Sequence, residues 1–88
     1  MTLLQLKKDL SKIFVNSKIK IKRDGFLEYM VFSQLYLEVC IRLYDNVIYA
    51  EVWNSFNWVD NNKCCYSYDL VELSGWLNGL VGDMNARI

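Results

Sequence analysis

The amino-acid sequence predicts an α+β fold, in which an antiparallel sheet of about four or five strands is flanked by an N-terminal and a C-terminal helix (α-β-β-β-β-α order). Apolar residues near both ends recur with the period of an α-helix, whereas the middle of the chain alternates between apolar and polar residues, as strands do. Turn-forming pairs such as Asp24-Gly25 and Asp45-Asn46 separate the alternating runs. Because 88 residues is the length of one domain, we expect a single small globular domain over residues 1–88.

The N-terminal segment has the pattern of an amphipathic helix. Thr2 followed by Gln5 is a capping-box pattern, in which each side chain can bond the other residue's backbone. At 100° per residue, five apolar residues fall within an arc of about 100°. These residues are Leu3, Leu6, Leu10, Ile13 and Phe14. The sequence therefore predicts a helix over residues 2–15.

Strict alternation follows in residues 18–22, where two isoleucines are separated by lysines. This pattern predicts a strand with Ile19 and Ile21 facing the core. A three-residue loop over residues 24–26 would align Ile21 with Tyr29, so we expect that loop and a second strand over residues 27–32. Residues 25–36 are apolar enough that their period also allows a helix, and this alternative stays open.

The alternation of apolar and polar residues in residues 37–54 predicts a central β-hairpin. A two-residue loop at Asp45-Asn46 pairs Leu43 with Ile48, so that both strands direct aliphatic side chains to one face. We expect this face to be buried. The opposite face mixes aromatic and charged side chains, which is unusual for a purely solvated surface.

The C-terminal region predicts a short strand over residues 64–68 and then a helix. Asp69 with Glu72 repeats the capping pattern, and the apolar residues that follow share one broad face. We expect the helix to cover residues 70–81, with Gly82 as its C-terminal cap. The residues of the apolar face are Leu70, Leu73, Trp76, Leu77, Leu80 and Val81.

The residue inventory argues against an enzyme. The chain has no histidine, so the usual general base is missing, and its three cysteines form no CxxC pair that would bind zinc. The four glycines do not form a phosphate-binding loop. We therefore expect no catalytic residues, no metal site and no cofactor. Charged residues interrupt every apolar run before the roughly 20 residues that a membrane span needs, and no secretory signal is recognisable, so we expect a cytoplasmic protein without a membrane partner.

A protein partner is the leading functional hypothesis. Aromatic and arginine side chains tend to dominate binding energy at interfaces, and the outward face of the central hairpin carries both. The loop after the hairpin adds two aromatic residues that can cover the core or contact a partner. The candidate partner-binding residues are Arg42, Tyr44, Tyr49, Glu51, Trp53, Phe56 and Trp58. Whether this surface binds a foreign target or forms a homodimer stays open.

In size and composition the chain is similar to the small inhibitors that phages and mobile elements direct against host defence systems, anti-CRISPR proteins among them. The similarity is one of general character and implies no residue roles. It suggests a non-enzymatic inhibitor that occludes a functional surface of its partner.

A nucleic-acid-binding domain is the alternative hypothesis. The first 23 residues hold seven basic residues and one acidic residue, and the helix–strands–helix order resembles the double-stranded-RNA-binding domain. That family has a lysine cluster at the start of its last helix, where this chain has Asp69 and Glu72, whose charges repel phosphate. The candidate phosphate-binding residues are Lys7, Lys8, Lys12, Lys18, Lys20, Lys22 and Arg23.

Overall fold

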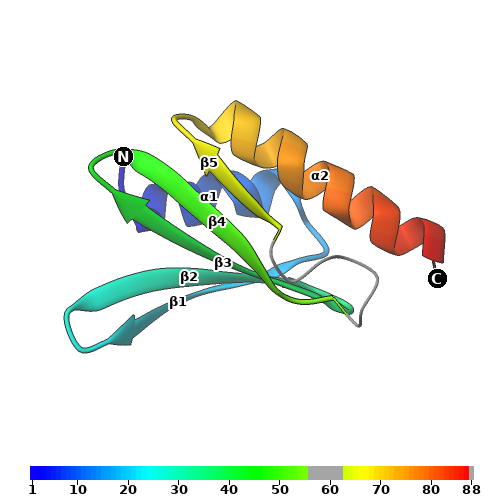
Figure 1. Ribbon diagram of the computed structural model, residues 1–88, viewed down its shortest axis with the longest axis horizontal. Helices are drawn as coiled ribbons and strands as arrows, with labels where there is room; N and C mark the ends of the chain where they lie inside the picture. The colour runs from blue at the N-terminus through cyan, green and yellow to red at the C-terminus, as the bar shows by residue number, and fades with distance from the viewer. Residues whose placement is uncertain (56–62, 88) are drawn as a thin grey trace.

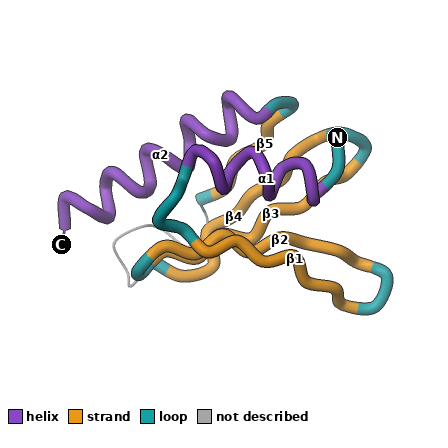
Figure 2. Tube along the Cα trace, turned by 180° about the vertical axis from the view of Figure 1, so that it is seen from behind, coloured by secondary structure: helices purple, strands orange, loops and turns teal. Residues whose placement is uncertain are grey.

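The computed structural model describes residues 1–55 and 63–87, and it confirms the α+β prediction. Five strands form one antiparallel sheet in the order β1-β2-β3-β4-β5, and both helices lie on the same side of it (Figures 1 and 2). The fifth strand extends the predicted order to α-β-β-β-β-β-α. The elements are α1 (Leu3–Ile13), β1 (Lys18–Asp24), β2 (Leu27–Gln34), β3 (Leu37–Tyr44), β4 (Val47–Asn54), β5 (Cys64–Ser67) and α2 (Leu70–Arg87).

Helix α1 begins where the capping pattern predicts. The Thr2 Oγ1 accepts a hydrogen bond from the Gln5 backbone N–H at 3.1 Å, which satisfies one of the free donors of the first turn. Leu6 and Leu10 on its inner side are fully buried against the sheet. The helix ends at Ile13, and the Phe14 N–H still donates to the Leu10 carbonyl at 2.8 Å.

The central hairpin has the predicted register. Leu43 lies opposite Ile48, and Val39 opposite Val52. Both loop residues have positive φ, 47° for Asp45 and 65° for Asn46, which a two-residue type I′ turn requires. Asp and Asn tolerate this conformation better than other non-glycine residues, so the turn sequence sets the register.

The predicted register of the first hairpin is wrong by one residue. Its loop consists of Gly25 and Phe26, and Ile21 lies opposite Met30 rather than Tyr29. Gly25 has φ of 63° at the first loop position, where a type II′ turn places a residue of positive φ. The observed register buries Met30 completely and turns Tyr29 to the other face of the sheet. The open alternative of a helix in residues 25–36 is also settled, because β2 is a strand.

Helix α2 is longer than predicted. It begins after Asp69, whose Oδ1 accepts a hydrogen bond from the Glu72 N–H at 2.9 Å, and it continues to Arg87. Gly82 therefore does not cap the helix. Val81 and Met84 on either side of it are buried and extend the apolar face by another turn, which favours continuation of the helix.

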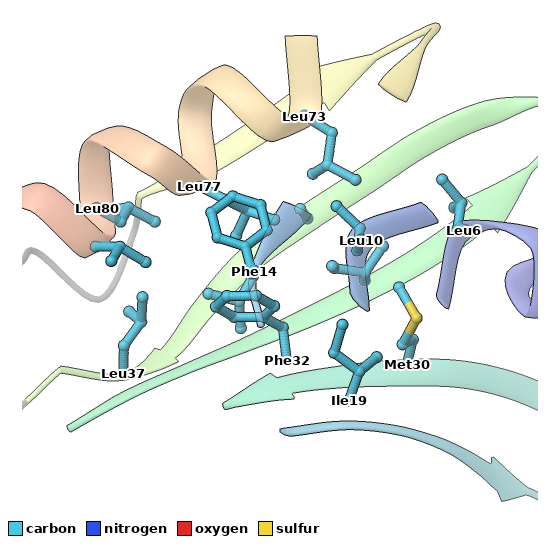
Figure 3. Packing of buried hydrophobic residues seen from close by; sticks show 14 of the residues in the cluster. Leu6, Leu10, Phe14, Ile19, Met30, Phe32, Leu37, Leu73, Leu77 and Leu80 are labelled. Atoms are coloured by element: carbon cyan, nitrogen blue, oxygen red, sulfur yellow. The ribbon is translucent and has the colours of Figure 1, made fainter. Parts of the chain in front are cut away.

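One hydrophobic core fills the space between the sheet and the two helices (Figure 3). Phe14, just after α1, packs edge to face on Phe32 of β2, with 5.3 Å between ring centroids. On the helix side of the core, α2 contributes Leu73, Leu77 and Leu80. All three belong to the predicted apolar face and are buried. Both helices therefore cover the same face of the sheet.

Candidate partner-binding face

The face of the sheet opposite the helices carries the candidate site, and we refer to it as the outer face. Successive side chains along a strand point to opposite faces of the sheet. Every second residue of each strand therefore points away from the core and belongs to the outer face. Among the described residues, no helix or strand covers this face (Figures 1 and 2). Its central positions are Tyr29 and Val31 on β2, Cys40 and Arg42 on β3, Tyr49, Glu51 and Trp53 on β4, and Tyr66 on β5.

A connected group of side chains occupies the middle of the outer face. The Arg42 guanidinium donates to the Glu51 carboxylate at 3.3 Å, and the Trp53 indole N–H donates to the same Glu51 oxygen at 3.1 Å. The Trp53 ring also contacts Tyr29, with centroids 5.7 Å apart. Neighbouring side chains leave Cys40 only 1% exposed, whereas Trp53 stays 45% exposed. Contacts within the protein therefore hold this group in place.

A second aromatic pair lies between β4 and β5. The Tyr49 and Tyr66 rings meet edge to face with centroids 4.7 Å apart, and the Tyr66 hydroxyl donates to the Tyr49 hydroxyl at 3.4 Å. This hydrogen bond raises the pKa of Tyr66 to about 12, since it stabilises the protonated phenol. Tyr66 remains 64% exposed, so the pair adds an uncharged aromatic surface at neutral pH.

The sheet splits at one end between its second and third strands. The β2–β3 ladder stops at Met30 opposite Ile41, although the β1–β2 and β3–β4 ladders continue to their turns. Figures 1 and 2 show the ends of the two hairpins diverging. A cleft of about 490 Å³ lies here, lined by residues of both hairpins and by Thr2 and Leu3 at the start of α1.

The structure brings together most of the predicted partner-binding residues. Alternation places all five candidates of the central hairpin, from Arg42 to Trp53, on the outer face. Phe56 and Trp58 lie outside the described residues. Sequence reasoning missed Tyr29, because the predicted register turned it inward. It also missed Tyr66, although its alternation with Cys65 on the last strand was a signal that could have identified it.

The basic residues are divided between the two sides of the sheet. Lys7, Lys8 and Lys12 belong to α1 on the covered side, whereas Lys18, Lys20 and Lys22 project from the outer face of β1. Arg23 points to the covered side and forms an ion pair with Glu28 at 3.1 Å. The predicted phosphate-binding set is thus not gathered on one surface.

The surroundings of two of the three cysteines disfavour the reactive thiolate form. Burial raises the pKa of Cys40, an effect that the adjacent Arg42 only partly offsets, and burial also raises the pKa of Cys65. Cys64 is exposed. Residues 1–55 and 63–87 contain no cluster of potential metal ligands. In the same residues, neither helix is both long and apolar enough to cross a bilayer.

No protein-family model matches this chain, and the comparisons with curated proteins and with solved structures also found no match. The geometry of the outer face and the cleft therefore carries the functional argument alone.

Proposed function

We propose that this chain is a non-enzymatic protein-binding module that presents the outer face of its sheet to a partner. The observation that carries the proposal is the placement of both helices on one side, so that no helix of residues 1–55 and 63–87 lies over the aromatic side of the sheet. Tyr, Trp and Arg are the residue types in which interface binding energy concentrates, and all three lie there.

The fixed arrangement of these side chains supports the proposal. Ordering a flexible side chain at an interface costs about 0.5–1.5 kcal/mol, and this cost falls when contacts already hold the side chain in the free protein. Glu51 holds both Arg42 and Trp53 through hydrogen bonds, and Tyr66 holds Tyr49. A rigid sheet carrying pre-positioned aromatic groups is the kind of scaffold that presents a binding surface well.

Inhibition by occlusion is the mode of action that we infer for such a module. A chain that binds through one broad face covers part of its partner's surface, and it needs no chemistry of its own to block that surface. Inhibitors carried by phages and mobile elements, including anti-CRISPR proteins, work in this general way. The size of this chain and its lack of a recognisable catalytic constellation in the sequence support the same role.

Site-specific photo-crosslinking tests the proposal. A photoreactive phenylalanine analogue is placed at Tyr49 on the outer face or at Val71, which is exposed on α2, and each full-length variant is expressed in the cells that make the protein. We expect a covalent protein adduct from position 49 and none from position 71. Adducts from position 71 alone would contradict the proposal.

The affinity of the crosslinked partner for variants then tests the aromatic residues. Tyr49→Ala and Trp53→Ala should each weaken binding by about 2 kcal/mol, or roughly 30-fold, while circular dichroism shows the fold intact. Val71→Ala is the matched control and should bind normally. Sedimentation identifies a homodimer if the adduct is a second copy of the chain. If both aromatic variants bind normally and Lys20→Ala abolishes binding to duplex RNA, the nucleic-acid hypothesis replaces this one.

A further inference from the structure

The split between β2 and β3 leaves backbone groups without a strand partner. We propose that the cleft between the two hairpin ends accepts an extended peptide segment, with apolar side chains and one basic side chain, that forms backbone hydrogen bonds to both β2 and β3. The inference rests on the protein-binding function proposed above, because it states the chemistry that one part of the partner would have.

Strand geometry identifies the free backbone groups. In an antiparallel hairpin, consecutive residues direct their N–H and C=O groups alternately toward one neighbouring strand and the other. The two-residue turns close on the pairs Asp24–Leu27 and Tyr44–Val47, whose backbone groups face each other. The groups of Glu28 and Leu43 therefore point away from their own hairpins and into the cleft. Within the described part of the chain, neither residue has a ladder partner on that side.

These two residues would be the next pair to exchange backbone hydrogen bonds if the β2–β3 ladder continued, because Tyr29 and Arg42 between them direct their backbone groups toward their own hairpins. The ladder stops two residues earlier on each strand, at Met30 and Ile41, so the hairpin ends offer two strand edges that face each other. The proposed segment would lie between these edges and pair with both, which is strand addition with two acceptor strands instead of one.

The side chains around the cleft favour an apolar segment. Leu3, Leu27 and Leu43 line it, and Tyr29 and Tyr44 add aromatic surface. Leu27 is 59% exposed and Phe26 at the turn is fully exposed, which is unusual for large apolar side chains so close together. Because they flank the unpaired backbone, a bound segment would cover them at the same time.

The charges around the cleft favour a bound segment that carries a basic residue. Glu28 is paired with Arg23 at 3.1 Å, and Arg42 is paired with Glu51 at 3.3 Å, so both charges are balanced by partners. Asp24 also lines the cleft and makes no ion pair with any described residue. The cleft thus carries one uncompensated carboxylate, which a lysine or arginine of the segment would neutralise.

Amide hydrogen exchange of the full-length protein, followed by NMR, tests the geometry. The probes are three capped pentapeptides with valine at positions 1, 3 and 5, glutamine at position 4, and Lys, Gln or Glu at position 2. In the free protein, we expect the Glu28 and Leu43 amides to exchange fast, whereas the Met30 and Ile41 amides are protected. The lysine peptide should slow exchange at Glu28 and Leu43 together by about tenfold or more, and the glutamate peptide should bind about tenfold more weakly.

Variants of Glu28 and Asp24 and one modified peptide test whether the peptide binds through backbone hydrogen bonds or only through its side chains. Glu28→Pro removes the N–H that faces the cleft, where no ladder bond is lost, and should reduce affinity for the lysine peptide about tenfold, whereas Glu28→Gln keeps the N–H and should bind nearly normally. Asp24→Asn should abolish the preference for lysine over glutamate. If Glu28→Pro does not fold, N-methylation of the central valine removes a peptide donor instead and should weaken binding to the unaltered protein about tenfold.

Several outcomes would overturn the inference. Protected Glu28 and Leu43 amides in the free protein would mean that the two hairpins are paired in solution and leave no cleft. Equal binding of the lysine and glutamate peptides, unchanged binding after N-methylation, or peptide effects confined to Tyr49 and Tyr66 would exclude strand addition at this place. If the crosslinked partner still depends on Tyr49 and Trp53 in that case, the proposed function stands and only the cleft hypothesis fails.

Discussion

Leu35 has a backbone conformation that few large residues adopt. It is the first residue of the two-residue turn between β2 and β3, its φ is 50°, and its side chain is 72% exposed. The left-handed region costs a non-glycine residue about 1–2 kcal/mol because the Cβ approaches the following carbonyl. An exposed side chain gains little from packing, so this strain is not offset locally.

Replacement of Leu35 by glycine should therefore stabilise the fold. Relief of the strain exceeds the entropy that glycine loses on folding, and we expect the free energy of unfolding to rise by about 0.5–1 kcal/mol. Urea denaturation followed by circular dichroism measures the change. Val15→Gly is the matched control, because Val15 is equally exposed and its φ is not positive, and this variant should lose about 0.5–1 kcal/mol. A loss of stability at both positions would show that Leu35 contributes contacts that outweigh its strain.

The three cysteines should differ in reactivity because their burial differs. Cys64 is exposed, whereas burial raises the pKa of Cys65 and of Cys40 and so lowers their thiolate fraction. With iodoacetamide at pH 8, we expect Cys64 to be alkylated about tenfold faster than Cys65, and Cys40 to react only in denaturant. Tandem mass spectrometry locates the label, and Cys64→Ser removes the fast phase. Rapid labelling of Cys40 in the folded protein would show that the outer face opens around it.

Both strands of the central hairpin contribute buried residues to the core. Ile41 is fully buried on β3, between Met30 of β2 and Ala50 of β4. A small domain is stable by only about 5–15 kcal/mol, and an unpaired buried carboxylate costs much of that amount. Ile41→Asp should therefore abolish the cooperative thermal transition. Lys20→Asp places the same residue on the outer face of β1 and should change stability by no more than about 1 kcal/mol. A melting curve of Ile41→Asp close to that of the parent would mean that this face is not the core.

How well each element could be predicted depended on how local its determinants are. Asp45 and Asn46 both accept positive φ, so the turn itself specified the register of the central hairpin. Gly25 also accepts positive φ, but it can occupy more than one position in loops of different length, and the neighbouring alternation fits two registers. The packing of Met30 against the helices decided between them, and that contact is not visible in the local pattern.

The same distinction explains the end of α2. A glycine after an apolar helix is typical of a cap, and Gly82 has that position in the sequence. The helix continues because Met84, one turn beyond Leu80, finds space in the core. Whether such space exists depends on how the two helices lie on the sheet, which is a property of the tertiary structure.

At the scale of the whole molecule, the candidate face was predictable in part and the cleft was not. In the central hairpin, the alternation of apolar and polar residues was enough to identify the aromatic face. The five candidate residues from Arg42 to Trp53 were therefore predicted correctly to share it. β2 and β3 separate because the two hairpins diverge toward their turns. In the sequence, both strands continue their alternating pattern through this region. Residues 27–29 and 42–44 give no local sign that they fail to pair with each other.

Charge is distributed unevenly over the molecule, and this should affect the rate of association more than the stability of a complex. Lys18, Lys20 and Lys22 form a row beside the aromatic group on the outer face. Exposed charges at the rim of an interface mainly steer encounters, so Lys20→Ala should slow association with the crosslinked partner about threefold at low salt and leave dissociation unchanged. Stopped-flow kinetics at 20 mM and 500 mM NaCl, concentrations chosen to vary charge screening, should show the difference disappear at high salt. A faster dissociation at both concentrations would instead place Lys20 in the buried part of the interface.

The same row of lysines has a consequence for how the protein behaves when concentrated. β1 is the first strand of the sheet, and its outer side has no strand partner within residues 1–55 and 63–87. An unpaired edge can add strands from other molecules, and lysines on such an edge prevent this because two copies repel each other. Between the lysines lie Ile19 and Ile21, which would pair readily once that repulsion is gone. Acetylation of all three lysines would remove this repulsion and should therefore favour dimers in which two copies pair through β1.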